Sequence, residues 1–283
     1  MDNLAVSTAL FDGHDMAVAF EEIAQVGLRK AEPAFIGGYS NFTEATLSED
    51  NGTQLARQAR EAGLTIAAVS AHMDLGKSGD EPLEQLQRRI RFVSACDSSV
   101  LITNAGQAED RDRIEATIEA ALPLAETLGV MLALENPGHG MGAAISDISS
   151  GKDLIGRLDH SLVRLNYDAG NVYTYSGATL QPGQDLRGRD LTGIGYIHLK
   201  DIAAAGDDWS FCPLGDGLVD LAGLFKMISS KFSMSLELPL HLNRPGRGVP
   251  VRAARLPIAH LREALTRSLY NLNSIILKSE LDA

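Results

Sequence analysis

The sequence has few cysteines, no long apolar run and a shortage of positive charge, and each of these excludes a class of protein. Its two cysteines, Cys96 and Cys212, are too few for a disulfide framework and lack metal-site spacing. No stretch approaches about 18 consecutive apolar residues, which argues against a membrane span. The 25 basic residues are outnumbered by 37 acidic ones, a net charge of −12, whereas a nucleic-acid partner requires a basic face.

The composition is that of a soluble globular chain, with 45% hydrophobic and 22% charged residues. The N-terminal segment MDNLAVSTALFDGHDM has no basic flank before an apolar run, so it does not resemble a secretory signal. We therefore expect a cytoplasmic protein with no membrane association. No linker or shift in composition divides the chain, which predicts a single domain over residues 1–283.

Short apolar runs alternate with helix-length segments, the pattern of a parallel α/β sheet. The runs predict eight strands, at residues 4–8, 28–35, 64–70, 99–103, 130–134, 163–167, 195–199 and 233–238. Helices are predicted at residues 16–26, before Gly63, and at 81–96, 110–128, 151–158, 221–229 and 257–268. Residues 168–194 are expected to be rich in loops, and residues 271–283 to form a C-terminal helical extension. Eight such units favour a closed (βα)8 barrel (TIM barrel), with an open doubly wound sheet as the alternative.

In a (βα)8 barrel, the residues that follow the carboxyl ends of the strands meet at one mouth, where the chemistry takes place. The polar residues at these positions are Glu32, His72, Asn104, Glu135, Asn136, Asp168, His198 and Glu237. Strands five to eight thus end in Glu, Asp, His and Glu, in that order. This sequence of strand ends predicts a functional site at the mouth.

Glu135, Asp168, His198 and Glu237 fit a divalent-metal site with three carboxylates and one imidazole. Oxygen-rich ligation favours Mn²⁺ or Mg²⁺, with Co²⁺ and Zn²⁺ as alternatives. Such an ion would polarise a substrate carbonyl and acidify the neighbouring C–H bond. Glu135 and Glu237, on opposite sides of the mouth, would then serve as base and acid for proton transfer.

Several motifs resemble those of the xylose-isomerase-like barrel superfamily of sugar phosphate isomerases and epimerases. They are FEEIAQVGLRKAEPAF, LALENPGHG, LNYDAGNVY, YIHLKD, LGDGLVDLAGLF and MSLELP, and together they extend over essentially the whole chain. The resemblance implies that Glu135, Asp168, His198 and Glu237 bind the metal and that Glu135 and Glu237 transfer the proton. It also implies that His72 and Asn104 line the substrate pocket and that Glu32 is the acid at the end of strand two.

The chain departs from the superfamily pattern at one position and from the pattern of its ketose 3-epimerases at two others. Asn171 replaces a frequent His, Ala204 replaces an Arg, and Met141 replaces a Glu. These differences argue against a standard ketose 3-epimerase. Side chains from the same loops are instead available to contact a polyol, namely His139, Tyr173, Tyr175, Trp209 and Arg244.

Lys200 follows His198 by two residues, so on a strand the two side chains share a face. A lysine there could stabilise an enediolate oxygen, and we include Lys200 among the expected catalytic residues. Asp201 is expected to hydrogen-bond a loop or a ligand behind the site.

The sequence thus predicts a divalent-metal-dependent isomerase or epimerase of a sugar or polyol-derived carbonyl compound, with a metal-stabilised enediolate between the two proton transfers. The alternative on the same residues is a dehydratase of an inosose or dehydroshikimate type. Two further alternatives are a DNA-repair endonuclease, which the net charge disfavours, and a non-catalytic binding protein. The apolar stretch 265–277 is expected to pack on the barrel, or otherwise to form a homo-oligomer contact.

Overall fold

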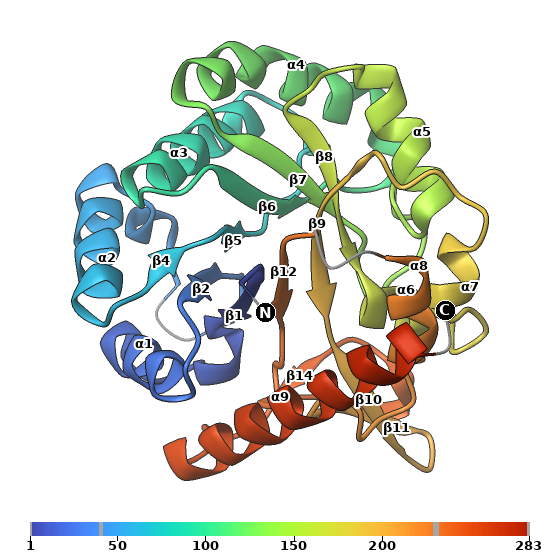
Figure 1. Cartoon of the computed structure of the whole chain (residues 1–283). Coiled ribbons are helices and arrows are strands. Elements are labelled where there is room, and N and C mark those ends of the chain that lie inside the picture. Colours follow the sequence, from blue (N-terminus) through green and yellow to red (C-terminus); the bar gives the residue numbers. More distant parts are fainter. Residues whose placement is uncertain (1, 40–41, 229–231, 282–283) are drawn as a thin grey trace.

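The computed structural model describes residues 2–39, 42–228 and 232–281 of the chain. Ten parallel strand segments form the central sheet (Figure 1). They are β1 (Leu4–Ser7), β2 (Lys30–Glu32), β3 (Ala34–Phe35), β4 (Thr65–Ile66), β5 (Val69–Ala71), β6 (Val100–Asn104), β7 (Met131–Glu135), β8 (Val163–Asp168), β9 (Ile194–Leu199) and β12 (Met234–Leu236).

The sheet closes on itself into a barrel of eight strand positions. Pro33, which has no N–H to donate, separates β2 from β3, and residues 67–68 separate β4 from β5. Because β2 pairs with β4 and β3 pairs with β5, each broken pair still occupies neighbouring strand positions. The first strand, β1, pairs with β2 on one side and with the last strand, β12, on the other. The predicted (βα)8 barrel is therefore confirmed, and an open sheet is excluded.

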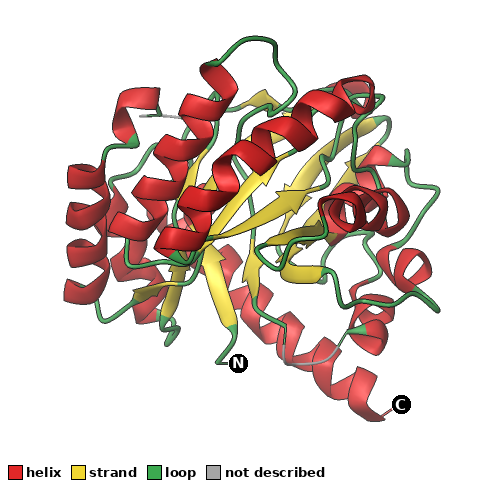
Figure 2. Cartoon of the chain, turned by 90° about the horizontal axis from the view of Figure 1, so that it is seen from above, coloured by secondary structure: helices red, strands yellow, loops and turns green. Residues whose placement is uncertain are grey.

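Helices surround this barrel on its outside (Figures 1 and 2). They are α1 (Met16–Gln25), α2 (Glu49–Glu61), α3 (Glu81–Ala95), α4 (Arg111–Leu128), α5 (Ile148–Leu158), α8 (Leu221–Met227) and α9 (Ile258–Leu281). Local signals set their ends. Asp147 caps α5 by accepting a hydrogen bond from the Ser150 N–H, and Gly129 ends α4 in the left-handed conformation.

Two predictions about the helices need correction. The helix expected at residues 257–268 does not stop there, because α9 continues through the predicted extension as one helix to Leu281. Its apolar side chains Leu265 and Leu272 are buried within the chain, whereas Tyr270 and Leu277 are exposed. The stretch expected to be rich in loops contains two short helices, α6 (Ala169–Tyr175) and α7 (Pro182–Leu186).

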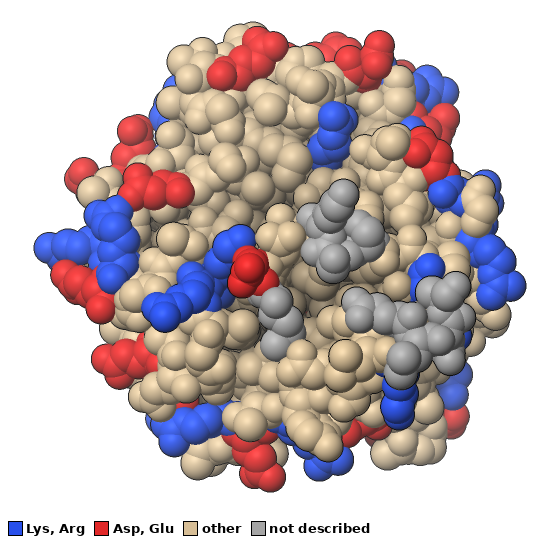
Figure 3. Space-filling view, viewed as in Figure 1, with Lys and Arg blue, Asp and Glu red and all other residues tan. Residues whose placement is uncertain are grey.

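Parts of three predictions lie outside the described residues. They are Ser229 of the helix predicted at 221–229, residues 282–283 of the predicted extension, and residue 1 of the predicted domain. Among the described residues, none of the helices combines the length and apolar character that a bilayer crossing requires. On the face shown in Figure 3, basic and acidic side chains alternate around the periphery.

A second, antiparallel sheet lies beside the barrel and was not predicted. It consists of β10 (Asp201–Ala205), β11 (Asp208–Cys212), β13 (Leu242–Arg244) and β14 (Val251–Arg252), in that order. Because β10 follows β9 directly and β13 follows β12, this sheet extends from the carboxyl ends of the last two barrel strands. It therefore brings residues of two distant loops next to the barrel mouth.

The interior of the barrel changes from apolar to polar along its axis. Strand residues alternate between the inside and the outside of the barrel, with a period of two. Ala68, Ile102, Ala133 and Tyr196 form a small apolar cluster apart from the main core. Two residues further along the same strands are Ser70, Asn104, Glu135 and His198, so the polar part of the interior lies at the carboxyl ends.

Candidate metal centre

Four side chains from consecutive barrel strands converge at the carboxyl-terminal mouth. Glu135 ends β7, Asp168 ends β8, His198 lies in β9 and Glu237 follows β12. One potential ligand atom from each lies within 4.8 Å of all the others. His198 Nδ1 is 3.3 Å from Glu135 Oε2, 3.7 Å from Asp168 Oδ2 and 3.1 Å from Glu237 Oε2. All four residues are at most 4% exposed.

The atoms that point to the centre of this cluster fit a metal ion. His198 Nδ1 is buried and has no hydrogen-bond partner, while Asp168 Oδ2 and Glu237 Oε2 share a single ammonium, that of Lys200. A cation would satisfy Nδ1 and neutralise the two carboxylates further. The charges agree with this interpretation. Four buried carboxylates, including Glu32, face the Lys200 ammonium and the imidazoles of His198 and His72, so the cluster keeps a negative charge even when both imidazoles are protonated. Within the described residues, this is the only such convergence of His, Cys, Asp and Glu side chains.

Glu32 orients His198 from below the cluster. Its Oε2 lies 3.1 Å from His198 Nε2, and the hydroxyls of Ser70 and Ser235 donate hydrogen bonds to the same carboxylate. A proton on Nε2 leaves the lone pair of Nδ1 directed at the other three ligands, as in carboxylate–histidine–metal arrangements. The sequence marked Glu32 as an acid at a strand end but gave no indication of this partner, because 166 residues separate the two.

Amide groups hold the two carboxylates contributed by β7 and β8. Asn166 and Asn171 each donate a hydrogen bond to Glu135, and Asn136 both donates to the backbone carbonyl of Asp168 and accepts from its N–H. Asn166 was not predicted, although the period-two pattern of LNYD places it on the same face as Asp168.

The charge of Glu135 is stabilised within the protein. Burial raises its pKa, but the nearby charges of His198 and His72 outweigh burial and lower the pKa to about 2. His72 Nε2 lies 3.4 Å from Glu135 Oε2. Glu135 is therefore ionised at neutral pH, as a metal ligand or a base must be.

Lys200 places an ammonium group beside two carboxylates of the cluster. Its Nζ lies 2.7 Å from both Asp168 Oδ2 and Glu237 Oε2 and donates a hydrogen bond to Asn171 Oδ1. Burial opposes its charge, but the carboxylates of Asp168 and Glu237 outweigh burial and raise the pKa of Lys200 above its usual range. Lys200 and His198 in turn overcome the effect of burial on Glu237 and lower the pKa of that carboxyl. Lys200 thus faces the cluster, as the shared strand face predicted.

A cavity of about 670 Å³ opens above the four-residue cluster, a size typical of sites for small ligands. Four of the five predicted substrate-binding residues line it, namely His72, Asn104, His139 and Arg244. Trp209 does not line this cavity. It is 1% exposed and packs against Tyr173, with ring centroids 5.8 Å apart. Tyr175 is engaged as well, because its hydroxyl accepts a hydrogen bond from the Ala143 N–H.

Comparison with known proteins agrees with this architecture. A family model described as "Xylose isomerase-like TIM barrel" matches residues 20–263. The chain belongs to this family. A search of curated proteins found no significant match.

Solved structures of similar fold align with almost the whole length of this xylose isomerase-like chain. D-psicose 3-epimerase from Clostridium cellulolyticum H10 has a TM-score of 0.72 at 14% identity, over 96% of this chain and 99% of its own. The zinc-bound IOLI protein has a TM-score of 0.73 at 15% identity, over 98% of both chains. The probable 3-DHS dehydratase AsbF from Bacillus anthracis has a TM-score of 0.69 at 15% identity, over 95% and 98%. These similarities establish the fold.

Asp201 anchors the loop that follows β11 in this xylose isomerase-like barrel. Its Oδ1 accepts hydrogen bonds from the N–H groups of Ile202 and Val219, and its Oδ2 from those of Gly215 and Gly217. A Cβ on Gly217 would lie 2.2 Å from Asp201 Oδ1, which explains the glycine in the LGDG motif. The carboxylate thus attaches this loop to the chain three residues after His198.

Asp201→Asn is expected to lower the free energy of unfolding by about 2–4 kcal/mol, because the new NH₂ group cannot accept the two hydrogen bonds that Oδ2 accepts. Urea denaturation monitored by circular dichroism measures this loss. Asp207→Asn, on an exposed residue of the same sheet region, is the matched control. Equal stability of the two variants would contradict the assigned role of Asp201.

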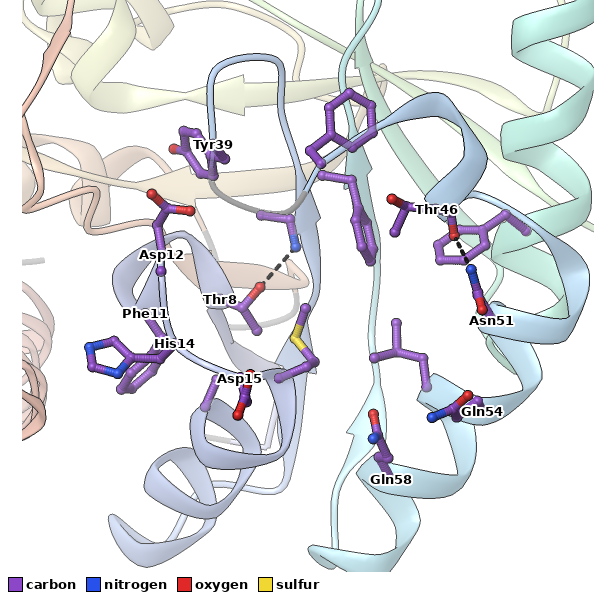
Figure 4. Close-up of a pocket in the computed structure, with 18 residues that line it drawn as sticks. Thr8, Phe11, Asp12, His14, Asp15, Tyr39, Thr46, Asn51, Gln54 and Gln58 are labelled. Carbon is purple, nitrogen blue, oxygen red and sulfur yellow. Dashed lines mark hydrogen bonds between the residues drawn. The ribbon is translucent and has the colours of Figure 1, made fainter. Parts of the chain in front are cut away.

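A second cavity, of about 330 Å³, lies between α1 and α2 (Figure 4). Its wall is largely apolar, and two of its polar groups bond within the protein. Thr8 Oγ1 accepts a hydrogen bond from the Ala34 N–H, and Asn51 Nδ2 donates one to the Thr46 carbonyl (Figure 4). None of the four residues of the metal-type cluster lines this cavity.

Proposed function

We propose that the chain is a divalent-metal-dependent isomerase or epimerase of a sugar or polyol-derived carbonyl compound. The observation that supports this most strongly is the convergence of Glu135, Asp168, His198 and Glu237 below an open cavity. Their donor set of three carboxylates and one imidazole suits Mn²⁺ or Mg²⁺, with Co²⁺ and Zn²⁺ as alternatives. When bound, the ion supplies Lewis-acid polarisation of the substrate carbonyl.

The residues of the chain perform the proton transfers. One of the two glutamates, Glu135 or Glu237, removes the proton from the carbon next to the carbonyl and leaves an enediolate. The other glutamate returns a proton to that carbon from the opposite face for epimerisation. For isomerisation, a proton is delivered to the neighbouring carbon. Asn166 and Asn171 keep Glu135 in place, and Lys200 does the same for Glu237.

The dehydratase reaction is the second candidate, and the position of Lys200 favours it. Its ammonium lies 2.7 Å from Glu237, so a proton donor is available beside the proposed base. After Glu237 removes the proton, loss of a β-hydroxyl requires an acid to convert it to water, and Lys200 can supply that proton. The solved relatives of similar fold include both an epimerase and a probable dehydratase.

A panel of keto-sugars, 2-keto-myo-inositol and 3-dehydroshikimate in D₂O, with Mn²⁺, Mg²⁺, Co²⁺ or Zn²⁺ added in turn, distinguishes the two reactions. For the isomerase or epimerase we expect deuterium at the carbon next to the carbonyl and an epimeric or isomeric product by NMR. A dehydratase instead produces enone or aromatic absorbance with release of water. Absence of both signals for every compound and every one of the four metal ions would refute the proposed function.

A further inference from the structure

Arg244 is a buried cation without a carboxylate partner. It is 3% exposed, and among the residues that the structure describes no acidic side chain lies within salt-bridge distance of its guanidinium. Its hydrogen-bond acceptors are two backbone carbonyls, those of Gly248 and Arg247. A buried charge of this kind is costly unless an opposite charge compensates it.

The second sheet fixes Arg244 in position at the mouth. Arg244 lies on β13 directly opposite Trp209 of β11, and its Cζ is 5.1 Å from the centre of the indole ring. Stacking on Trp209 and the two carbonyl contacts restrain the guanidinium while it lines the cavity above the four-residue cluster. The charge of Arg244 also acts on His139, which lines the same cavity. Burial and the charges of Arg244 and Lys200 lower the pKa of His139.

The other cations that line this cavity are already paired. Lys200 contacts Asp168 and Glu237, and Arg252 contacts Asp12. Arg247 stacks on the same indole ring, also at 5.1 Å, but it is exposed and does not line the main cavity. Arg244 is therefore the lining cation whose charge is available to a ligand.

We propose that Arg244 selects substrates bearing an anionic oxyacid group, a carboxylate or a phosphate, over neutral polyols. This proposal rests on the proposed function, since it concerns the substrate of the same site. The guanidinium presents N–H donors in a planar fork that suits either group, and a charge-assisted contact in a buried cavity is stronger than one in water. The carbonyl end of the substrate faces the four-residue cluster, and the anionic end faces Arg244.

Isothermal titration calorimetry of the Mn²⁺-supplemented full chain tests this with two matched pairs of probes. The pairs are D-fructose 6-phosphate with D-fructose, and 3-dehydroshikimate with its methyl ester. We expect the anionic member of one pair to bind at least about tenfold more tightly than its neutral partner. The pair that shows the preference identifies phosphate or carboxylate as the preferred group. Equal affinity within both pairs would overturn the proposal.

The Arg244→Met and Arg244→Gln variants are expected to bind the anionic and the neutral member of the preferred pair with similar affinity. The matched control is Arg247→Gln, which removes a like charge from the same Trp209 ring but outside the main cavity, and should keep the preference. Thermal unfolding identifies a variant that fails to fold. In that case the other Arg244 variant tests whether the preference for the anionic probe is lost. An equal loss in Arg247→Gln, or a preference retained in a folded Arg244 variant, would contradict the assignment.

Proton exchange in D₂O separates this proposal from the proposed function. An Arg244-dependent preference without any exchange or turnover contradicts the proposed reaction and leaves the charge selection standing. Exchange on neutral compounds, with no preference for an anion, contradicts the charge selection alone.

Discussion

Glu237→Gln is expected to lower turnover by about 10²–10⁴-fold on any compound that the wild type converts. The amide that replaces the carboxylate can neither remove nor return a proton. The change is nearly isosteric, and the residue is only 4% exposed, so the shape of the site is kept. NMR of deuterium incorporation in D₂O measures the proton-transfer step directly.

Because Glu237 is also a proposed ligand, the assay is run at saturating Mn²⁺, and bound metal is measured separately. Glu135→Gln should show a loss of similar size, since the two glutamates act in succession in the proposed mechanism. Glu119→Gln, an exposed glutamate on α4, is the control and should retain full turnover. Full activity of both active-site variants would exclude them as the proton-transfer pair.

Addition of Mn²⁺ is expected to stabilise the folded protein, and chelation to reverse this. A ligand at 100 times its dissociation constant contributes about 2.7 kcal/mol, which for a chain of this size corresponds to roughly 4–5 °C in Tm. The physical reason is the excess negative charge of the buried cluster, which a divalent cation neutralises. Differential scanning calorimetry with and without EDTA provides the measurement.

The Asp168→Asn variant should lose most of this shift, because the substitution removes the negative charge of one of the four proposed ligands. Asp153→Asn, on an exposed carboxylate of α5, should keep it. A comparison of Mn²⁺, Mg²⁺, Co²⁺ and Zn²⁺ ranks the ions. No shift with any of the four, or an equal shift in Asp168→Asn, would show that the cluster does not bind the metal.

The barrel and the four converging side chains were predictable because both depend on local patterns. Runs such as LITN and MLALE are apolar and short, and each is followed by a helix-length segment with a recognisable stop such as Gly129. Once eight such units are counted, the geometry of the barrel determines that their strand ends meet. Glu135, Asp168, His198 and Glu237 therefore followed from position alone.

What could not be predicted depends on contacts between distant segments. The segment AAAGDD ahead of Trp209 has no alternation of apolar and polar residues, and β11 pairs with β13 more than 30 residues later. The position of Trp209 beneath Arg244, outside the main cavity, depends on that pairing. The contact between Glu32 and His198 likewise requires the closed barrel. Periodicity reports local structure only, so it could mark these residues as candidates but could not assign their partners.

The pairing of β1 with β12 has a consequence for the order in which the protein assembles. Residues 4–6 are synthesised long before their partners at residues 234–236, which belong to the last strand of the barrel. Since β12 lies between β9 and β1 and immediately precedes Glu237, the fourth proposed ligand reaches its place only when this last strand joins the sheet. Binding of a cation by all four proposed ligands would thus be a late event in the assembly of the protein.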